Sequence, residues 1–316
     1  MSLSIKSLLF CYLSLGCTLS HAQSDAFQRD YDRSRALDST GKHTQAVKLL
    51  DKLVTEPSWE FRARMSRSSS YLASGSFELA FNDISAAMKL EPDSVGPYMN
   101  RGSMYLSAGM PDRALADFDD GLKKSSQTKD SVSFYLNRGS ALGMMRRFQE
   151  AVDSYDNALR LDPANRSVRL NKASTLDDLG RPDEAKQLLL QLLAETPNDL
   201  MILNNLGFQA NAQGDLDDGL SWFTQAQQVA PDDPLVLNNL GYSQLRTGNV
   251  QDALKNIQRS ISLYPANSYA YRNLGLVWQA KGEKDKACTA FEKALGLGFS
   301  DQYGPEVQQL RKTYCP

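Results

Sequence analysis

Histidine is almost missing from this chain of 316 residues, which contains only two. His21 falls in an apolar stretch at the N-terminus, and His43 falls in a predicted turn. Nucleophilic catalysis by a triad needs a histidine held within the fold, and a histidine-rich metal site needs several. We therefore expect neither a triad of this kind nor such a metal site.

Phosphate-binding motifs and a strong charge of either sign are also lacking. The chain has no G-x-x-x-x-G-K-[S/T] or G-x-G-x-x-G segment, and its net charge is −2 with no basic stripe. Paired carboxylates such as Asp177-Asp178, Asp217-Asp218 and Asp232-Asp233 fall in turns or near helix ends, where capping explains them. The sequence predicts a protein that is not an enzyme, has no cofactor and does not bind nucleic acid.

The one long apolar run lies at the N-terminus and is too short to cross a bilayer. It follows Lys6, extends from Leu8 to Leu19, and ends at Ser20-His21-Ala22, which has small residues where a signal peptidase cuts. We expect residues 1–22 to be an export signal, and the rest to be periplasmic or secreted. Leu15-Gly16-Cys17 leaves open a second interpretation, a lipoprotein anchored in the envelope through Cys17.

What the chain does contain is a small residue that returns every 34 positions, with a single step of 37. The first series is Ser34, Ser68, Gly102, Gly139, Ala173, Gly207, Gly241 and Gly275. Twelve positions after each comes a second small residue: Ala46, Ala80, Ala114, Ala151, Ala185, Gly219, Ala253 and Ala287. We number the two series positions 8 and 20 of a repeat. Two phased series over eight repeats predict an array of similar units.

Each repeat contains residues that end the two helices of a helical hairpin. Glycine stands at position 15 in seven repeats and Arg146 takes its place in the fourth, while proline closes most units. Glycine ends a helix because a positive φ costs it little, and proline stops the second helix because it has no N–H to donate. A bulky residue recurs at position 24, for example Phe223 and Phe291. The small residues allow two helices to approach closely.

This pattern resembles the tetratricopeptide repeat family. The eighth repeat shows it through Tyr271, Asn273, Leu274, Gly275, Trp278, Gly282, Ala287, Phe291 and Ala294. The resemblance implies an all-α, right-handed α-solenoid of about eight repeats over residues 23–295, whose first helices line a concave groove, followed by a capping segment at 296–316. We expect the longer end of repeat three, residues 125–130, to form a longer surface loop.

Two of the four cysteines, Cys288 and Cys315, lie outside the predicted signal. A pair of thiols in an exported chain suggests a disulfide, which would clamp the capping segment onto the last repeat. The family resemblance supports this prediction, since cysteine-bearing caps end many exported bacterial repeat proteins.

Asparagine occupies position 6 in six consecutive repeats: Asn100, Asn137, Asn171, Asn205, Asn239 and Asn273. In the family's geometry this position faces the groove, where an amide can bind both the N–H and the C=O of an extended peptide. Phe208, Tyr242 and Arg272 add aromatic and charged candidates between Met201 and Arg272. Hydrogen bonds to a neighbouring helix are the alternative for the amides.

Position 7 divides the array. It is basic in repeats one to five, as at Arg67 and Arg101, and leucine in repeats six to eight. We expect the basic side chains to form ion pairs with Asp83, Asp117 and Asp153 on the second helices. The leading hypothesis is an exported scaffold that holds an extended segment of a protein partner. The alternative is a structural envelope lipoprotein that organises an outer-membrane or secretion assembly, with membrane contact only through a lipid on Cys17.

Overall fold

The structure of the chain, a computed structural model, describes residues 24–315. The predicted export signal and Cys17 therefore lie outside the described residues. Within residues 24–315 the regular elements are all helices, without a strand, which confirms the all-α prediction. In the same residues no helix combines the length and apolar character needed to cross a membrane.

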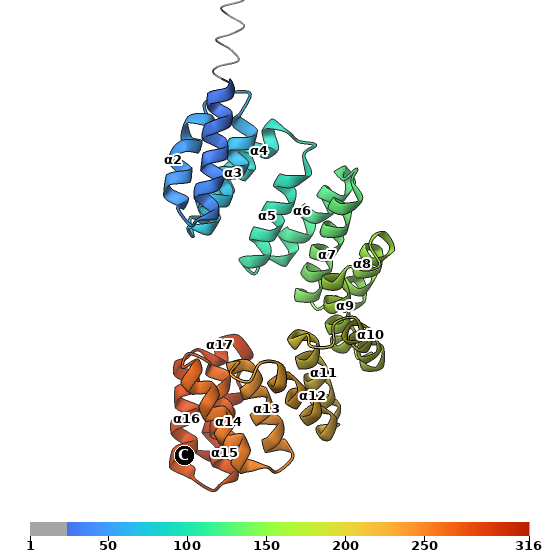
Figure 1. Cartoon of the computed structure of the whole chain (residues 1–316), viewed down its shortest axis with the longest axis vertical. Coiled ribbons are helices and arrows are strands. Elements are labelled where there is room, and N and C mark those ends of the chain that lie inside the picture. The colour runs from blue at the N-terminus through green and yellow to red at the C-terminus, as the bar shows by residue number, and fades with distance from the viewer. Residues whose placement is uncertain (1–23, 316) are drawn as a thin grey trace, which may run out of the picture. The chain divides into compact units, whose positions relative to one another are not determined.

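The first of two compact units ends at Pro163. Its helices form four hairpins, which correspond to repeats one to four (Figure 1). The elements are helical residues 24–39, α2 (His43–Leu53), α3 (Glu60–Ala73), α4 (Phe77–Leu90), α5 (Val95–Ser107), α6 (Pro111–Lys124), α7 (Thr128–Met144) and α8 (Phe148–Leu161). Each hairpin packs against the next one in the unit, so the core is a series of layers.

The second unit begins at Ala164 and holds repeats five to eight. Its hairpins consist of α9 (Arg166–Asp178), α10 (Pro182–Glu195), α11 (Leu200–Gln213), α12 (Leu216–Val229), α13 (Pro234–Arg246), α14 (Val250–Leu263), α15 (Ser268–Ala280) and α16 (Lys284–Gly296). Two short helices follow, α17 (Phe299–Tyr303) and α18 (Glu306–Tyr314). We call these two helices the cap.

The turn inside each hairpin has the same left-handed backbone. The glycines at position 15 have φ between 68° and 89°, as the sequence predicts. Arg146 adopts φ 60° at the equivalent place and is the one residue other than glycine with a positive φ among residues 24–315. The hairpin geometry therefore sets the backbone conformation even where the side chain disfavours it.

The small residue at position 8 lies directly under the bulky residue at position 24. A Cβ atom added to Gly139 would lie 2.4 Å from the ring of Tyr155, and one added to Gly275 would lie 2.3 Å from Phe291. Where position 8 is Ala173, the facing residue belongs to the same buried cluster and is the smaller Leu189. This close approach confirms the packing inferred from the two series of small residues.

The three extra residues of repeat three do not lengthen a loop, so that expectation was wrong. The connection after α6 covers only residues 125–127, and α7 has 17 residues where α5 has 13. Residues 128–130 contain neither proline nor glycine, and Asp130 in the first turn suits the positive end of the helix dipole. The insertion therefore becomes an extra turn at the start of α7.

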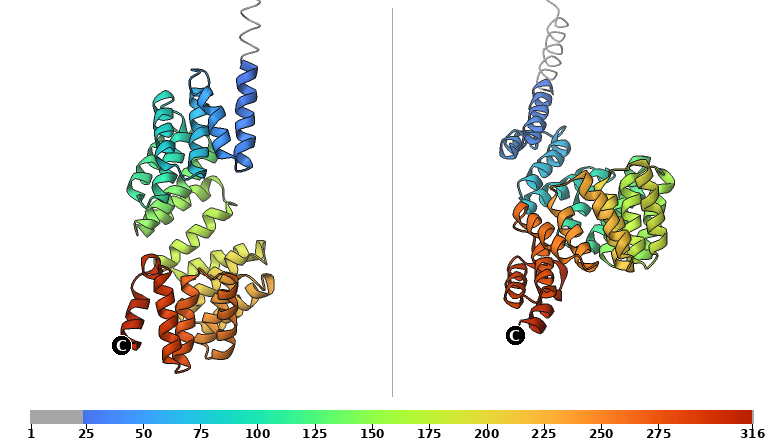
Figure 2. Two further views of the ribbon diagram at one scale, coloured as in Figure 1. Left: turned by 90° about the vertical axis from the view of Figure 1, so that its left-hand side faces the viewer. Right: turned by 60° about the horizontal axis from the view of Figure 1, so that its bottom comes forward.

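The cap closes the last hairpin of the second unit. Phe299 and Val307 are fully buried against Ala287, Phe291 and Ala294, and Figure 2 shows α18 beside α16. The structure joins Cys288 of α16 to Cys315 by a disulfide, with the two Cα atoms 5.7 Å apart. The apolar contacts and this link both join the C-terminal segment to α16.

Candidate functional site

The six asparagines at position 6 lie on the first helices α5, α7, α9, α11, α13 and α15. We call the surface that these helices form within one unit the first-helix face of that unit. Asn171 is exposed, while Asn100 and Asn205 are half-buried. These three amides bond to no other described residue, so they remain available to a ligand.

The other three asparagines already have partners. Asn137 Nδ2 donates to the carbonyl oxygen of Ser133 at 2.9 Å, within its own helix. Asn239 Nδ2 donates to Asn204 Oδ1 at 3.2 Å, one repeat away. Asn273 is 0% exposed and bonded on both sides, so it lies inside the fold and a ligand cannot reach it there.

Arg272, another predicted contact residue, is 6% exposed and joins the last repeat to the cap. Its guanidinium lies between the rings of Tyr242 and Tyr269, 4.9 and 5.4 Å from their centroids, and pairs with Glu306 of α18. Burial works against the charge, but the hydrogen bond to Glu306 leaves the pKa of Arg272 raised. The side chain is held in place rather than offered to solvent.

Tyr242 is half-buried beside two arginines. Burial alone would raise the pKa of its hydroxyl, but the hydrogen bond from Arg246 Nη1 at 3.4 Å and the charge of Arg272 lower it. The two guanidinium groups thus favour the deprotonated form of this hydroxyl.

An exposed aromatic ring lies beside a free amide on α11. Phe208 is 46% exposed, and its ring meets the ring of buried Phe223 at 5.5 Å, nearly perpendicular. Phe208 and Asn205 line a hollow of about 120 Å³ together with Asp177 and Gln209. Of the predicted residues, these two are the pair that the structure brings together at the surface.

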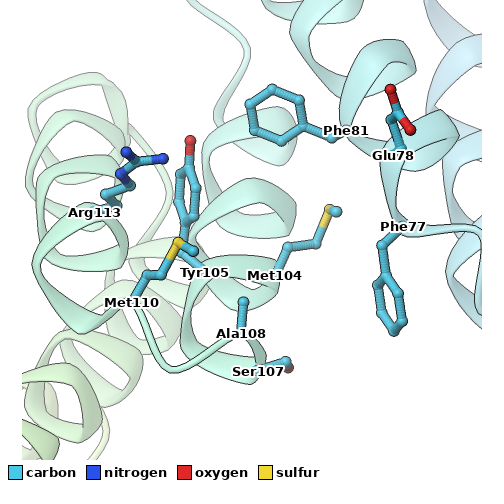
Figure 3. Close-up of a pocket in the computed structure, with 9 residues that line it drawn as sticks. All are labelled: Phe77, Glu78, Phe81, Met104, Tyr105, Ser107, Ala108, Met110 and Arg113. Carbon is cyan, nitrogen blue, oxygen red and sulfur yellow. The ribbon is translucent and has the colours of Figure 1, made fainter.

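A larger hollow in the first unit was not predicted. It has a volume of about 540 Å³ and is lined mostly by apolar side chains of α4 and α5, with Met110 and Arg113 beside them (Figure 3). Phe81 and Tyr105 line it side by side in an edge-to-face contact, with 6.0 Å between ring centroids, and Phe77, which also lines it, is 60% exposed. The helical spacing of Phe77 and Phe81 was the available signal, but it is equally typical of a core.

Ion pairs connect first and second helices in the first unit, as predicted for two of the three pairs. Arg67 Nη2 lies 2.7 Å from Asp83 Oδ1, and Arg101 Nη2 lies 2.6 Å from Asp117 Oδ1. Both aspartates are buried, and the hydrogen bonds raise the pKa of Arg101.

The prediction of a third ion pair, between Arg138 and Asp153, is wrong. Arg138 instead bonds to Asp119 at 2.7 Å and to Ser154 Oγ at 3.0 Å. Asp153 stands at position 22 and points to solvent, whereas Ser154 stands at position 23, the place of Asp83 and Asp117.

Two carboxylates, those of Asp199 and Asp233, cap helices of the second unit. Asp233 Oδ1 accepts hydrogen bonds from the backbone N–H groups of Leu235 and Val236, which caps α13 as the sequence suggests. Over residues 24–315 no three histidine, cysteine or acidic side chains come together as a metal site would require.

Family comparisons fit this geometry. One family model described as tetratricopeptide repeat matches residues 144–203, and another with the same description matches residues 99–166 and 238–303. Together the matched ranges cover more than half of the chain. The chain belongs to the tetratricopeptide repeat family.

Curated relatives of this tetratricopeptide repeat protein match only in part. The human protein "DnaJ homolog subfamily C member 3" is 24% identical over 200 residues, which are 58% of this chain and 39% of that protein. The Gallus gallus protein of the same name is 26% identical over 150 residues, 45% of this chain and 30% of that protein. The chain thus spans less than two fifths of the length of these relatives.

Solved structures show the same fold. A tetratricopeptide repeat protein from Parabacteroides merdae has a TM-score of 0.68 at 18% identity, over 80% of this chain and 98% of that one. Yeast Tom70 has a TM-score of 0.65 at 18% identity, over 86% of this chain and 58% of that one. The chain is a tetratricopeptide α-solenoid, a fold that generally binds protein or peptide partners and serves as a scaffold rather than a catalyst.

Proposed function

We propose that the chain is an exported, non-catalytic scaffold whose second unit holds an extended segment of a partner protein on its first-helix face. The observation that carries this proposal is the pair on α11: Asn205 has a free amide, and Phe208 is an exposed aromatic ring beside it. Asn171, whose amide is also free, lies one repeat earlier on the same face.

The chemistry of these residues suits an extended peptide. A carboxamide can donate to a backbone carbonyl and accept from a backbone N–H at once, so it holds a chain whatever that chain's side chains are. Phe208 already contacts Phe223 on one side, and its other side can cover an apolar side chain of the partner. Amides would fix the backbone, and the ring would supply the apolar anchor.

The decisive experiment replaces Asn171 and Asn205, the two free amides of the second unit, together with alanine. Each lost hydrogen bond is worth about 0.5–1.5 kcal/mol, so affinity for a partner isolated by cross-linking from native envelopes should fall roughly five- to a hundredfold. Arg67→Ala with Arg101→Ala is the control, because it should destabilise the first unit and leave binding per folded molecule unchanged. An unchanged dissociation constant in a folded Asn171→Ala, Asn205→Ala protein would remove the proposal.

Export has its own test. We expect the mature chain to begin at Gln23, because Ser20-His21-Ala22 follows the apolar run. Mass spectrometry of the N-terminal peptide from the native host measures this directly. A peptide that begins at an acylated Cys17 would replace the free exported form by the envelope lipoprotein.

A further inference from the structure

A single series of hydrogen bonds crosses the first helices of the last three repeats. Arg272 Nη1 donates to Asn273 Oδ1 at 2.7 Å, and Asn273 Nδ2 donates to Asn238 Oδ1 at 2.9 Å. Asn238 Nδ2 donates to Asn239 Oδ1 at 3.2 Å, and Asn239 Nδ2 donates to Asn204 Oδ1 at 3.2 Å. We call these five side chains the amide relay.

Every bond of the relay runs in the same direction, and Arg272 determines which. A guanidinium can only donate, so Asn273 must turn its oxygen toward it and its nitrogen toward Asn238. The same requirement then passes along the series. Asn273 is fully buried and Asn238 is 2% exposed, so water cannot easily substitute for either partner.

The two ends of the relay differ. At the start, Glu306 of the cap pairs with Arg272 and helps fix its guanidinium. At the far end, half-buried Asn204 uses its oxygen to accept from Asn239, while its nitrogen donates to no other described residue. The first-helix face therefore offers an amide that is committed to donating.

We propose that Asn204 Nδ2 binds an acceptor oxygen of the partner segment, and that Glu306 positions this donor through Arg272 and the amide relay. The inference rests on the proposed function and adds to it which atom of the first-helix face donates the hydrogen bond to the partner. Bonds in such a series polarise one another, so the last N–H is a stronger donor than an isolated amide. The acceptor is a carbonyl or carboxylate oxygen of the peptide, either within the segment or at its C-terminal end.

The relay can be tested first without any ligand. In isotope-labelled mature protein, Glu306→Gln should shift the side-chain amide resonances of Asn204 and leave those of Gln213, an exposed amide at the end of the same helix, unchanged. Glu292→Gln is the matched control, because it breaks another ion pair of α18, with Arg311 at 2.9 Å, that has no contact with the relay. An Asn204 resonance that moves equally in both variants, or in neither, would overturn the coupling to the cap.

The donor is tested with peptides selected from a random display library on the full mature protein. Asn204→Ala should weaken the selected peptides about two- to tenfold, the loss of one hydrogen bond. Asn204→Asp should weaken them at least as much, because an acceptor then faces an acceptor while Asn239 keeps its partner. Gln213→Glu is the matched control, since it also turns an amide of α11 into a carboxylate, and it should leave binding unchanged.

Two further comparisons distinguish the outcomes. If amidating the peptide's C-terminus removes the effect of Asn204→Ala, the acceptor is the terminal carboxylate; if the effect persists, it is a carbonyl within the chain. Binding that depends on Asn205 and Phe208 but not on Asn204 overturns the relay and leaves the proposed function standing. Failure to select any peptide, or binding insensitive to all three residues, overturns both.

Discussion

The two units use different side-chain interactions to join the two helices of a hairpin. Between positions 7 and 23 of a hairpin, the first unit has buried ion pairs, Arg67 with Asp83 and Arg101 with Asp117. At the same two positions, repeat six of the second unit has Leu206 and Trp222, which belong to one apolar cluster. The turns and the contacts at positions 8 and 24 are alike in both units.

The comparison shows that the hairpin does not depend on what fills positions 7 and 23. The small residues and the left-handed turn set the geometry, and either an ion pair or an apolar contact then fits. The two solutions differ in how they fail: removing one partner of a buried ion pair leaves the other charge uncompensated, whereas trimming an apolar contact costs only its area and a cavity.

The largest expected difference between the units comes from the link between Cys288 and Cys315, a sequence separation of 27. Cys288→Ser with Cys315→Ser should lower the free energy of unfolding of the second unit by about 3–4 kcal/mol in the chain-entropy model. Hydrogen exchange should rise in α15, α16 and α18 and stay unchanged in α3–α6. Two free thiols found by alkylation of the unreduced, denatured protein would contradict the link itself.

The ion pairs give the next largest effect. Asp117→Ala should destabilise the first unit by about 2–4 kcal/mol, because it leaves Arg101 without its partner, and partial exposure of Arg101 keeps the loss below that of a fully buried charge. Urea denaturation measures the change. Asn256→Ala at the same position of repeat seven removes only a bond to Gln244 at 2.8 Å, and should cost about 0.5–1.5 kcal/mol.

A double replacement sharpens the same comparison. Arg101→Leu with Asp117→Asn reproduces the pair Leu240 and Asn256 of repeat seven. The double variant has neither charge, so no uncompensated charge is left inside the hairpin. It should therefore be more stable than Asp117→Ala. A double variant that is less stable would mean that the two units are not interchangeable at these positions.

The smallest effect concerns the turns. Arg146→Gly should raise the stability of the first unit by about 0.5–1 kcal/mol, since glycine adopts φ 60° without strain but is more flexible when unfolded. Gly180→Ala, at the equivalent turn of the second unit, has open space around it and should lower stability by about 1 kcal/mol from backbone strain alone. Thermal unfolding of the two variants should therefore shift in opposite directions.

The fold could be predicted because its determinants are local and repeated. Glycine at position 15 and the small and bulky pair at positions 8 and 24 each specify one contact, and the array copies it. The error over Asp153 came from a difference of one position, which rotates a side chain by about 100° around a helix and moves it from the partner helix to solvent. Composition around residues 125–130 did not reveal that the extra residues would continue a helix.

The site was less predictable, because asparagine has several uses. The same residue at position 6 is free at Asn205, bonded within its own helix at Asn137, and buried at Asn273. These differences arise from the neighbouring repeat and the cap, above all from Arg272 at position 5. A sequence pattern shows which residues recur, but not which neighbour has already used their hydrogen bonds.

The extra turn of α7 also shows where this architecture accepts new sequence. The three residues entered before Gly139, so the spacing from Gly139 to its bulky partner Tyr155 was preserved and the buried contact remained intact. Material added at the start of a first helix projects from the end of the hairpin and leaves its interior unchanged. We expect an affinity tag or a fluorescent reporter inserted between Ser125 and Gln127 to leave the hairpin intact in the same way. This connection is therefore the site we would use to attach one.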